Sequence, residues 1–340
     1  MSSSPRPKID KPSRATLRDV ANLAGVSEIS VSRVMRNAPN ISEVLREKVT
    51  SAANALSYTP NRLAGALKNQ TSNQVGVVLP SMSHDVFSSV LDGIESVLNK
   101  HGMHAVLGVS DYDSQREVNV VRELLAWSPM GIILTGLHQE HAIAGMIAQL
   151  DIPVVQIMDI EGSPIGSAVG ISHSEAAVAA AEFLHDKGYR KIGYIGAWSE
   201  KPDRSRARRI AFEKRLAELG APLVASLTSE DRSSAIVGSQ ATENLYRSYP
   251  EIDCIFYAND DLALGGLFYA MRTGIDVPRK LGIMGFNGSD IGKATPLTLS
   301  GIETPRYEMG EEAARLLLSF KSEGPRITDL SFSIVDGETT

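Results

Sequence analysis

The sequence predicts an all-α helix-turn-helix head followed by an α/β core made of two doubly wound parallel-sheet lobes. Two observations carry this prediction. Residues 15–58 hold three short helical patterns in succession, whereas from Val75 onward continuous apolar runs alternate with helical stretches. At 340 residues the chain is also long enough for one small folded unit and one or two larger ones.

The composition narrows the class of protein. Hydrophobic residues make up 43% and charged residues 22%, which is ordinary for a soluble globular protein. No apolar run reaches about eighteen residues, and the first residues lack the apolar stretch of a secretory signal, so we expect a cytoplasmic protein without a membrane partner. Cys254 is the single cysteine, which excludes an intrachain disulfide and a multi-cysteine metal site. We expect neither a metal nor a cofactor.

Charge is divided unevenly along the chain. Residues 1–70 carry 11 lysines and arginines against 5 aspartates and glutamates, while residues 71–340 carry 23 against 35. A basic head on an acidic body indicates a polyanionic partner for the head alone. A basic solubilising segment would produce the same imbalance, so the detailed pattern must decide between the two.

The first two helical patterns form a helix-turn-helix. Thr16 and Asp19 have the spacing of a capping box, and the apolar residues that follow share one helical face. Gly25 suits the left-handed conformation that ends a helix, and Ser27 can then cap a second helix over 28 to about 36. Two short helices joined by a tight glycine-containing turn are typical of this motif.

A third helix, opened by Ser42, completes a small domain over 15–58 whose second helix can read DNA. The second helix would enter the major groove with Glu28 and Ile29 over base edges, and Arg33 can pair with guanine. Short hydroxyls at helix starts suit phosphate oxygens, although capping or solvent exposure explains each serine alone at least as well. The candidate DNA contacts are Thr16, Ser27, Glu28, Ile29, Ser30, Ser32, Arg33, Arg36, Asn40, Ser42, Asn61, Ala64, Leu67 and Lys68.

Two stretches of the head carry a family signature. They are TLRDVANLAGVSEISVSRV at 16–34 and YTPNR at 58–62. In this order they resemble the N-terminal signature of the LacI/GalR family of bacterial repressors. The resemblance implies a sequence-specific DNA-binding regulator that presents two heads, as a homodimer, to a pseudo-palindromic operator DNA.

Residues 59–73 are expected to form a hinge helix and linker, preceded at 1–14 by a disordered tail. The resemblance implies that the hinge orders on operator DNA, where Leu67 would wedge into the minor groove with Lys68 beside it. A helix this short is unstable alone, and Gly65 lowers its propensity by roughly 1 kcal/mol against alanine. A floppy linker is the alternative.

The core, 74–340, shows short continuous apolar runs with helical stretches between them. Such runs are typical of parallel strands buried on both faces. Their number is larger than a single sheet of this kind usually holds, which indicates two sheets. The predicted strands are Val75–Leu79, Ala105–Val109, Gly131–Thr135, Val154–Met158, Ile192–Ile195, Ile255–Tyr257, Leu281–Gly285 and Leu299–Ile302.

The resemblance supplies the topology of the core. It implies a periplasmic-binding-protein-like fold whose chain crosses between the lobes three times, which we place near 171–173, 289–293 and 324–328. The first lobe would then span about 74–171 and 292–324, and the second about 172–290 and 325–336. We expect the last four residues to fray. No leucine-heptad segment follows the lobes, which favours a dimer over a coiled-coil tetramer.

A ligand site is expected between the lobes. Doubly wound sheets bind ligands beyond the carboxyl ends of their strands, and two facing lobes make a cleft there. Arginine fits a carboxylate or a pair of hydroxyls with its fork, although an arginine in the basic run 206–209 could equally lie on a solvated helix face. The resemblance implies that the effector contacts are Phe87, Asp159, Arg208, Asn259 and Asn287.

Asn287 and Gly288 depart from the family pattern for neutral sugars, which has Asp at the first position and often at the second. Their replacement removes up to two negative charges from the pocket, which favours an anionic ligand. Positive potential could also come from Lys201, Arg204, Arg232, His84 and His138.

Over its length the chain is similar to the gluconate-type repressors within this family, most clearly at 76–87, 152–159 and 258–265. This similarity implies a repressor of sugar-acid catabolism that is relieved by a small anionic sugar acid such as gluconate, a ketogluconate or a phosphorylated relative. The alternatives are a neutral-sugar or corepressor-responsive regulator, or a ligand-binding transport component, for which the head would have no purpose.

An enzyme is the remaining class to weigh. The sequence has no dinucleotide-binding, Walker, nucleophile-elbow or HExxH motif. His138 and His141 stand three residues apart without a third metal ligand, and helix capping explains Asp260 and Asp261 better than a catalytic carboxylate pair does. We therefore predict a regulator without enzymatic activity.

Overall fold

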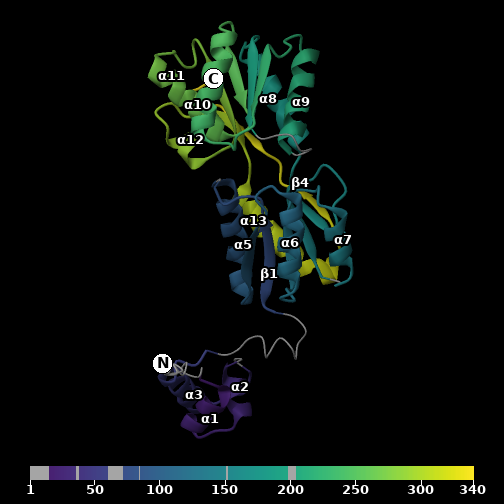
Figure 1. Cartoon of the computed structure of the whole chain (residues 1–340), viewed down its shortest axis with the longest axis vertical. Helices are drawn as coiled ribbons and strands as arrows, with labels where there is room; N and C mark the ends of the chain where they lie inside the picture. The colour runs from purple at the N-terminus through teal and green to yellow at the C-terminus, as the bar shows by residue number, and fades with distance from the viewer. Residues whose placement is uncertain (1–14, 36–37, 60–71, 84, 151, 198–203) are drawn as a thin grey trace, which may run out of the picture. The chain divides into compact units, whose positions relative to one another are not determined.

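Three helices pack together in the first of the two units into which the chain divides, residues 1–72 and 73–340. The computed structural model, shown in Figure 1, describes residues 15–35, 38–59, 72–83, 85–150, 152–197 and 204–340. Within the first unit these helices are α1 (Leu17–Ala24), α2 (Glu28–Met35) and α3 (Glu43–Ala55). Val20, Val31 and Val49, one from each helix, are fully buried at its centre. The helix boundaries agree with the sequence prediction.

Local chemistry fixes the turn between α1 and α2. The Thr16 side chain accepts a hydrogen bond from the Asp19 amide, and the Asp19 carboxylate accepts one from the Thr16 amide at 2.8 Å, so the capping box is present. Gly25 ends α1 with a φ of 61°, in the left-handed region that favours glycine. The Ser27 hydroxyl accepts from the Ser30 amide at 3.1 Å at the start of α2.

The second unit contains two six-stranded sheets among its described residues. The first sheet belongs to the N-lobe, which comprises 74–171 and 306–329. Its strands are all parallel and follow the order β2-β1-β3-β4-β5-β11. Their bounds are β1 (Gln74–Leu79), β2 (His104–Val109), β3 (Gly131–Thr135), β4 (Val154–Asp159), β5 (Ser167–Ile171) and β11 (Ile327–Asp329).

The second sheet belongs to the C-lobe, which comprises 172–303 and 333–340. It repeats the same winding in the order β7-β6-β8-β9-β10-β12, with only β12 antiparallel to its neighbour. Its strands are β6 (Ile192–Ala197), β7 (Ala225–Ser229), β8 (Cys254–Tyr257), β9 (Gly282–Asn287), β10 (Ser300–Glu303) and β12 (Ser333–Val335). The predicted fold class, a helix-turn-helix head and a two-lobed doubly wound core, is confirmed.

Helices cover both faces of each sheet. In the N-lobe, Val77 points to the face covered by α5 (Asp85–Leu98) and α13 (Arg306–Glu323), and Val78 points to the face covered by α6 (Ser114–Leu125) and α7 (His141–Ala148). In the C-lobe, the helices pack in pairs over one continuous core (Figure 1). The pairs are α8 (His173–Asp186) with α9 (Arg204–Glu218), and α10 (Ala235–Ser248) with α11 (Asp260–Thr273). The short helices η1 (Asn99–His101) and α12 (Asp290–Ala294) complete the described elements of this unit.

Two of the three crossings between lobes differ from the sequence prediction. The first, at Ser172 between β5 and α8, lies where we expected it. The second lies at 304–305 rather than at 289–293, because β10 adds beside β9 in the C-lobe with Gly301 paired to Gly285. The third lies at 330–332 rather than at 324–328, because β11 pairs with β5 of the N-lobe. Residues 292–303 therefore belong to the C-lobe, and 325–329 to the N-lobe.

The last residues are also more ordered than the sequence suggested. Thr339 is fully buried, and its hydroxyl donates to the Ile283 carbonyl at 2.7 Å and accepts from the Ser300 amide at 2.8 Å. These bonds tie the segment after β12 to β9 and β10, so the expected fraying of residues 337–340 is wrong. None of the helices described by the structure is long and apolar enough to cross a membrane.

Candidate functional site

The outward face of α2 carries the side chains predicted to read DNA. Glu28, Ile29 and Arg33 are exposed, and Ile29 keeps 74% of its surface accessible. Arg33 donates from Nη2 to the Pro39 carbonyl at 3.4 Å, a long bond that leaves its other nitrogens available. This face can present an apolar contact and a guanidinium side by side.

The hydroxyl groups near α2 and α3 take part in capping. The Ser27 and Ser30 hydroxyls lie 2.9 Å apart, and the Ser42 hydroxyl accepts from the Leu45 amide at 3.4 Å at the start of α3. Thr16 caps α1 in the same way, so each of these groups has a structural role in addition to any contact with phosphate. Ser32 is half-buried, and Asn40 is exposed with a φ of 62°. Arg36, Asn61, Ala64, Leu67 and Lys68 lie outside the described residues.

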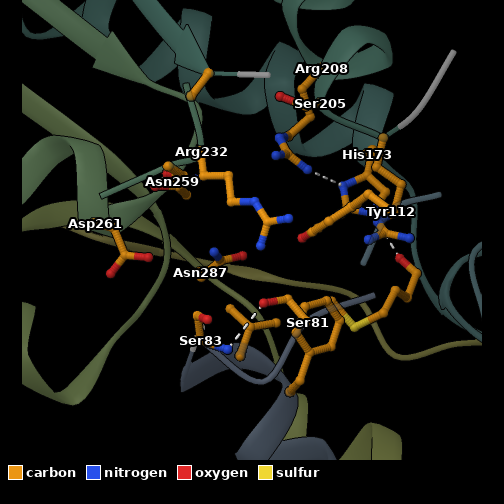
Figure 2. A pocket seen from close by; sticks show the side chains of 16 residues that line it. Ser81, Ser83, Tyr112, His173, Ser205, Arg208, Arg232, Asn259, Asp261 and Asn287 are labelled. Carbon is orange, nitrogen blue, oxygen red and sulfur yellow. Dashed lines mark hydrogen bonds between the residues drawn. The ribbon is translucent and has the colours of Figure 1, made fainter. Parts of the chain in front are cut away.

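A pocket in the second unit is lined from both lobes at the carboxyl ends of the strands. This is where doubly wound sheets bind ligands, next to the points where the strand order reverses. Figure 2 shows its polar side chains directed inward from several segments. The N-lobe contributes Ser81, Ser83, Val86, Phe87, Tyr112 and Met158, and the C-lobe contributes His173, Ala197, Arg204, Ser205, Arg208, Arg232, Ser233, Asn259, Asp261 and Asn287.

Arg208 is held in place by three contacts. Its Nη1 donates to Nδ1 of His173 at 3.0 Å, the bond drawn in Figure 2, and its Nη2 donates to the Ala258 carbonyl at 3.0 Å. The guanidinium carbon lies 4.1 Å from the centroid of the Phe286 ring, a cation–π contact. Arg208 is 8% exposed. Its planar group is therefore fixed at the pocket wall before a ligand binds.

His173 links the two lobes and is neutral. Its Nε2 lies 2.7 Å from the Met158 carbonyl, which can only accept, so Nε2 carries the proton and Nδ1 is free to accept from Arg208. Burial, followed by the nearby positive charges of Arg208 and Arg204, lowers the pKa of His173 well below its usual value. Through these two hydrogen bonds the histidine connects β4 of the N-lobe with Arg208 of the C-lobe.

Amide and hydroxyl groups of the C-lobe also line the pocket. Asn259 caps α11 through a bond from the Leu262 amide to its Oδ1 at 3.1 Å, while its Nδ2 lies 2.7 Å from the Ser233 hydroxyl. Asn287, at the end of β9, has a φ of 115°, which an L-residue rarely adopts. These groups offer neutral hydrogen bonds in several directions, as a polyhydroxylated ligand requires.

The pocket has a positive balance of charge. Arg204, Arg208 and Arg232 line it against a single carboxylate, that of Asp261, among the described residues. Arg204 also reaches the N-lobe, since its Nη1 lies 3.0 Å from the point where a side chain at Gly136 would begin. An anion in the pocket would meet three guanidinium groups, of which Arg208 is already oriented.

Two further arginines connect the lobes. Arg232 of the C-lobe pairs with Asp111 of the N-lobe at 2.7 Å. Arg306, at the start of α13 in the N-lobe, donates to the Gly288 carbonyl of the C-lobe at 2.9 Å and lies 3.5 Å from the carboxylate of Asp85. The arrangement of the lobes is thus fixed by charged groups next to the pocket as well as by the crossing segments.

Four of the five predicted effector residues meet at this pocket: Phe87, Arg208, Asn259 and Asn287. Asp159 does not line it. Asp159 is 5% exposed, and its Oδ1 accepts from the Glu161 amide at 2.9 Å, so its carboxylate is directed into the following loop, while the preceding Met158, with a φ of 80°, faces the pocket.

The residues that were expected to add positive potential do not all line the pocket. Arg204 and Arg232 line the pocket, whereas His138 is not among the lining residues. His84 and Lys201 lie outside the described residues. The sequence interpretation missed His173 and Tyr112. Their signal is position alone: His173 begins the helix after β5, and Tyr112 stands in the turn after β2.

Comparison with known proteins assigns each of the two units to a known type of domain. Residues 16–61 match the family described as bacterial regulatory proteins, lacI family, and residues 181–340 match a periplasmic binding protein-like domain. The HTH-type transcriptional regulator GntR of Escherichia coli K12 is 36% identical over 330 residues, which cover 96% of this chain and 99% of the relative.

Solved structures give the same assignment. A LacI family transcriptional regulator from Silicibacter pomeroyi is 37% identical, with a TM-score of 0.89 over 96% of this chain and 99% of its own. The lac repressor dimer bound to operator and the anti-inducer ONPF is 25% identical, with a TM-score of 0.82 over 96% of this chain and 99% of its own. The relatives cover the helix-turn-helix unit and both lobes together, and the chain therefore belongs to the LacI family of DNA-binding transcriptional regulators.

Proposed function

We propose that this regulator is a repressor of sugar-acid catabolism that is relieved when a small sugar acid binds in the cleft between the lobes. The observation that carries the proposal is the charge of the cleft, where Arg204, Arg208 and Arg232 outnumber the carboxylates that the structure describes there, Asp261 in the lining and Asp111 beside Arg232. Guanidinium groups in a partly enclosed site favour a carboxylate, whose charge would be costly to bury beside aspartates. Asn287 and Gly288, which replace the aspartates expected for a neutral sugar, support the same ligand class.

The remaining lining groups suit the polyol part of such a ligand. The amides of Asn259 and Asn287 and the hydroxyls of Ser81, Ser83 and Ser233 can each donate and accept hydrogen bonds. Phe87 offers an apolar surface for the carbon chain. A binding role fits this cleft better than a catalytic one, because His173, the buried imidazole at its wall, is neutral with both ring nitrogens bonded.

On the DNA side we propose that a homodimer places the two α2 helices on a pseudo-palindromic operator. Ile29 and Arg33 would contact base edges, and the hinge around Leu67 would enter the minor groove. One solved relative, the lac repressor, is described as a dimer bound to operator, and this description supports the proposed arrangement. An effector that binds the lobe arrangement of the DNA-free protein better would lower operator affinity by its differential binding, typically about 1–3 kcal/mol.

Two measurements on the full chain test the proposal. Isothermal titration calorimetry with gluconate, a ketogluconate, 6-phosphogluconate, glucose, glucitol and a purine should show binding of a sugar acid in preference to the neutral ligands. A mobility-shift assay with DNA from upstream of the gene should show a complex that the same acid dissociates. Tight binding of only a neutral sugar or a purine, or an acid that strengthens the complex, would overturn the proposed effector or its sign.

Arg33→Ala supplies the control that separates the two activities. It should weaken operator binding by roughly 1–3 kcal/mol and relax sequence preference, because a guanine contact is lost. Sugar-acid binding should stay unchanged, since the cleft belongs to the other unit. Normal operator binding by this variant would refute the assignment of α2 as the recognition helix.

A further inference from the structure

The turn that follows β2 is strained and faces the cleft. The Asp113 amide donates to the Ser110 carbonyl at 3.0 Å, which closes a tight turn with Asp111 and Tyr112 at its centre. Their φ angles are 56° and 58°, and turns with two positive φ angles normally take Asn-Gly. An aromatic residue at such a position is exceptional. The strain places Tyr112 in the lining of the pocket and directs the carboxylate of Asp111 towards the other lobe.

That carboxylate meets a cation from across the cleft. Arg232, in the C-lobe segment between β7 and α10, lies 2.7 Å from Asp111 through its Nη2. The bond lowers the pKa of Asp111 and raises that of Arg232, so both groups are charged. Arg116, from the same lobe as Asp111, lies farther away at 3.5 Å. The short contact is the one that joins the lobes.

Arg232 also belongs to the ligand pocket. Figure 2 shows its side chain extending from the side of Asn259 into the middle of the pocket. The hydroxyl of the next residue, Ser233, donates to Oδ1 of Asn259 on the pocket wall at 2.9 Å. The Arg232 side chain is 56% exposed, unlike the buried Arg208.

We propose that Arg232 exchanges Asp111 for the carboxylate of the effector, and that this exchange releases one contact between the lobes. The inference rests on the proposed function in that the effector is an acid. Asp111 then acts as an internal competitor that holds Arg232 at the pocket while no effector is bound. A neutral sugar offers no charge to replace Asp111 and leaves the pair intact.

The two arginines consequently have different tasks. Arg208, with its orientation fixed by His173 and Ala258, provides hydrogen bonds for an acid or a neutral sugar alike. Arg232 distinguishes between them, because only an anion repays the loss of its bond to Asp111. Selectivity for acids therefore depends on Arg232, and affinity for acids depends on how strongly Asp111 competes.

Calorimetry on single variants tests this division. Arg232→Gln should weaken gluconate about tenfold or more, the scale of one charge-assisted hydrogen bond, and weaken gluconamide less than about twofold. Asp111→Asn should instead tighten gluconate several-fold, since the competitor loses its charge. Arg116→Gln, which removes the partner of Asp111 within the N-lobe, is the matched control and should change neither ligand. Circular dichroism and thermal unfolding confirm that each variant is folded.

A distance measurement tests the release of the lobes. Glu123→Cys on α6 and Glu251→Cys before β8 place spin labels on exposed positions of the two lobes, while the fully buried Cys254 stays unlabelled. Gluconate should change the distance distribution of the doubly labelled protein, and Asp111→Asn and Arg232→Gln should each shift the unliganded distribution. Arg116→Gln should not.

The outcomes separate the two proposals. If the unaltered protein binds no sugar acid, the proposed function and the exchange both fail. If it binds gluconate but Arg232→Gln binds gluconate equally well, only the exchange fails. An effect of Arg116→Gln as large as that of Arg232→Gln would show a response to net charge alone and would also overturn the exchange.

Discussion

Arg208 has its guanidinium group oriented before any ligand arrives. His173, Ala258 and the ring of Phe286 fix its plane from three sides, so little side-chain entropy is left to lose on binding. An arginine that was free in solution would have to be ordered by the ligand itself. The buried guanidinium of Arg208 is therefore ready to bind a ligand, although the cleft itself stays open to solvent.

Replacing this fork with an ammonium group should be costly. Arg208→Lys retains the charge but cannot donate to His173 and Ala258 at once while lying flat on Phe286. We expect sugar-acid binding to weaken by about tenfold or more, the scale of one to two lost charged hydrogen bonds. Calorimetry measures the effect, and Arg209→Lys, in an ion pair with Glu213 on the same helix, is the control. Equal affinities for the two variants would contradict the preformed site.

Asp260 predicts a pH dependence of stability. Burial raises its pKa to about 6, although the Ser289 backbone amide and Arg306 favour the charged form. The folded protein thus keeps this proton up to about pH 6, whereas the unfolded chain releases it near the ordinary aspartate pKa of 3.8. The carboxyl stabilises the fold below the unfolded pKa, and this contribution is lost as the pH rises through the folded one, on the order of 3 kcal/mol in total.

Asp260→Asn should remove this pH dependence. Relative to the variant, the unaltered protein should lose free energy of unfolding between about pH 4 and pH 6, which urea unfolding at several pH values measures. Asp186→Asn, at a side chain that is 84% exposed, serves as the control substitution. A difference between the two proteins that stays constant over this range would rule out the proton uptake at Asp260.

Single residues also show where sequence-based prediction ends. Phe87, Arg208, Asn259 and Asn287 could be placed at the pocket through the resemblance to the LacI/GalR family, and Asn259 and Asn287 also lie at or just after the carboxyl end of a strand, where doubly wound folds gather their ligand contacts. Asp159 satisfies the same rule but lies beside Met158, whose positive φ turns the chain so that the methionine faces the pocket instead. A positive φ at a non-glycine residue such as Met158 cannot be recognised from the residue type, so this turn could not be predicted.

Glycines set the approach of one pair of helices in the N-lobe. A side chain at Gly310 of α13 would begin 2.0 Å from the Val90 carbonyl oxygen of α5, and one at Gly93 of α5 would begin 2.1 Å from the Tyr307 carbonyl oxygen of α13. The backbones of the two helices therefore touch. Because α13 starts directly after a crossing segment, this contact fixes where the chain re-enters the N-lobe.

A methyl group at this contact should destabilise the core. Gly310→Ala must separate α13 from α5, and overpacking of this kind costs about 1–3 kcal/mol. Gly145→Ala on α7, where a new side chain would meet nothing within 4 Å, should be neutral or stabilise by up to about 1 kcal/mol through helix propensity. Thermal or urea unfolding measures the stability of the two variants. Similar stabilities would show that the helices can separate without loss.

Most of the described strands were predictable as elements but not as members of a sheet, and β5, β7, β11 and β12 were not predicted at all. The runs at 281–285 and 299–302 were expected as strands, yet nothing in an apolar run says which lobe it joins, and β10 was expected in the wrong one. The strand β7 escaped notice because it alternates between half-buried and exposed positions, as edge strands do. Pairing between distant segments decides both cases.

At the scale of the whole molecule, charge is separated between the two units. The basic head and acidic core make attraction to DNA a property of the first 70 residues, while the core repels it. Operator affinity should therefore fall roughly a thousandfold or more between 50 and 200 mM salt if a dimer contacts six or more phosphates. Fluorescence anisotropy over a salt series measures the slope. A flat response would contradict binding through this charged head.

The three crossings determine when each part of the protein can fold during its synthesis. Neither lobe is a continuous stretch of chain, and residues 327–335 supply the outermost strand of both sheets, β11 to one and β12 to the other. During synthesis, the α1–α3 unit can fold as soon as it leaves the ribosome, but both lobes must wait with an open edge for the last segment to emerge. A message cut short after α13 would thus yield a chain whose head is intact and whose two sheets are both exposed to aggregation.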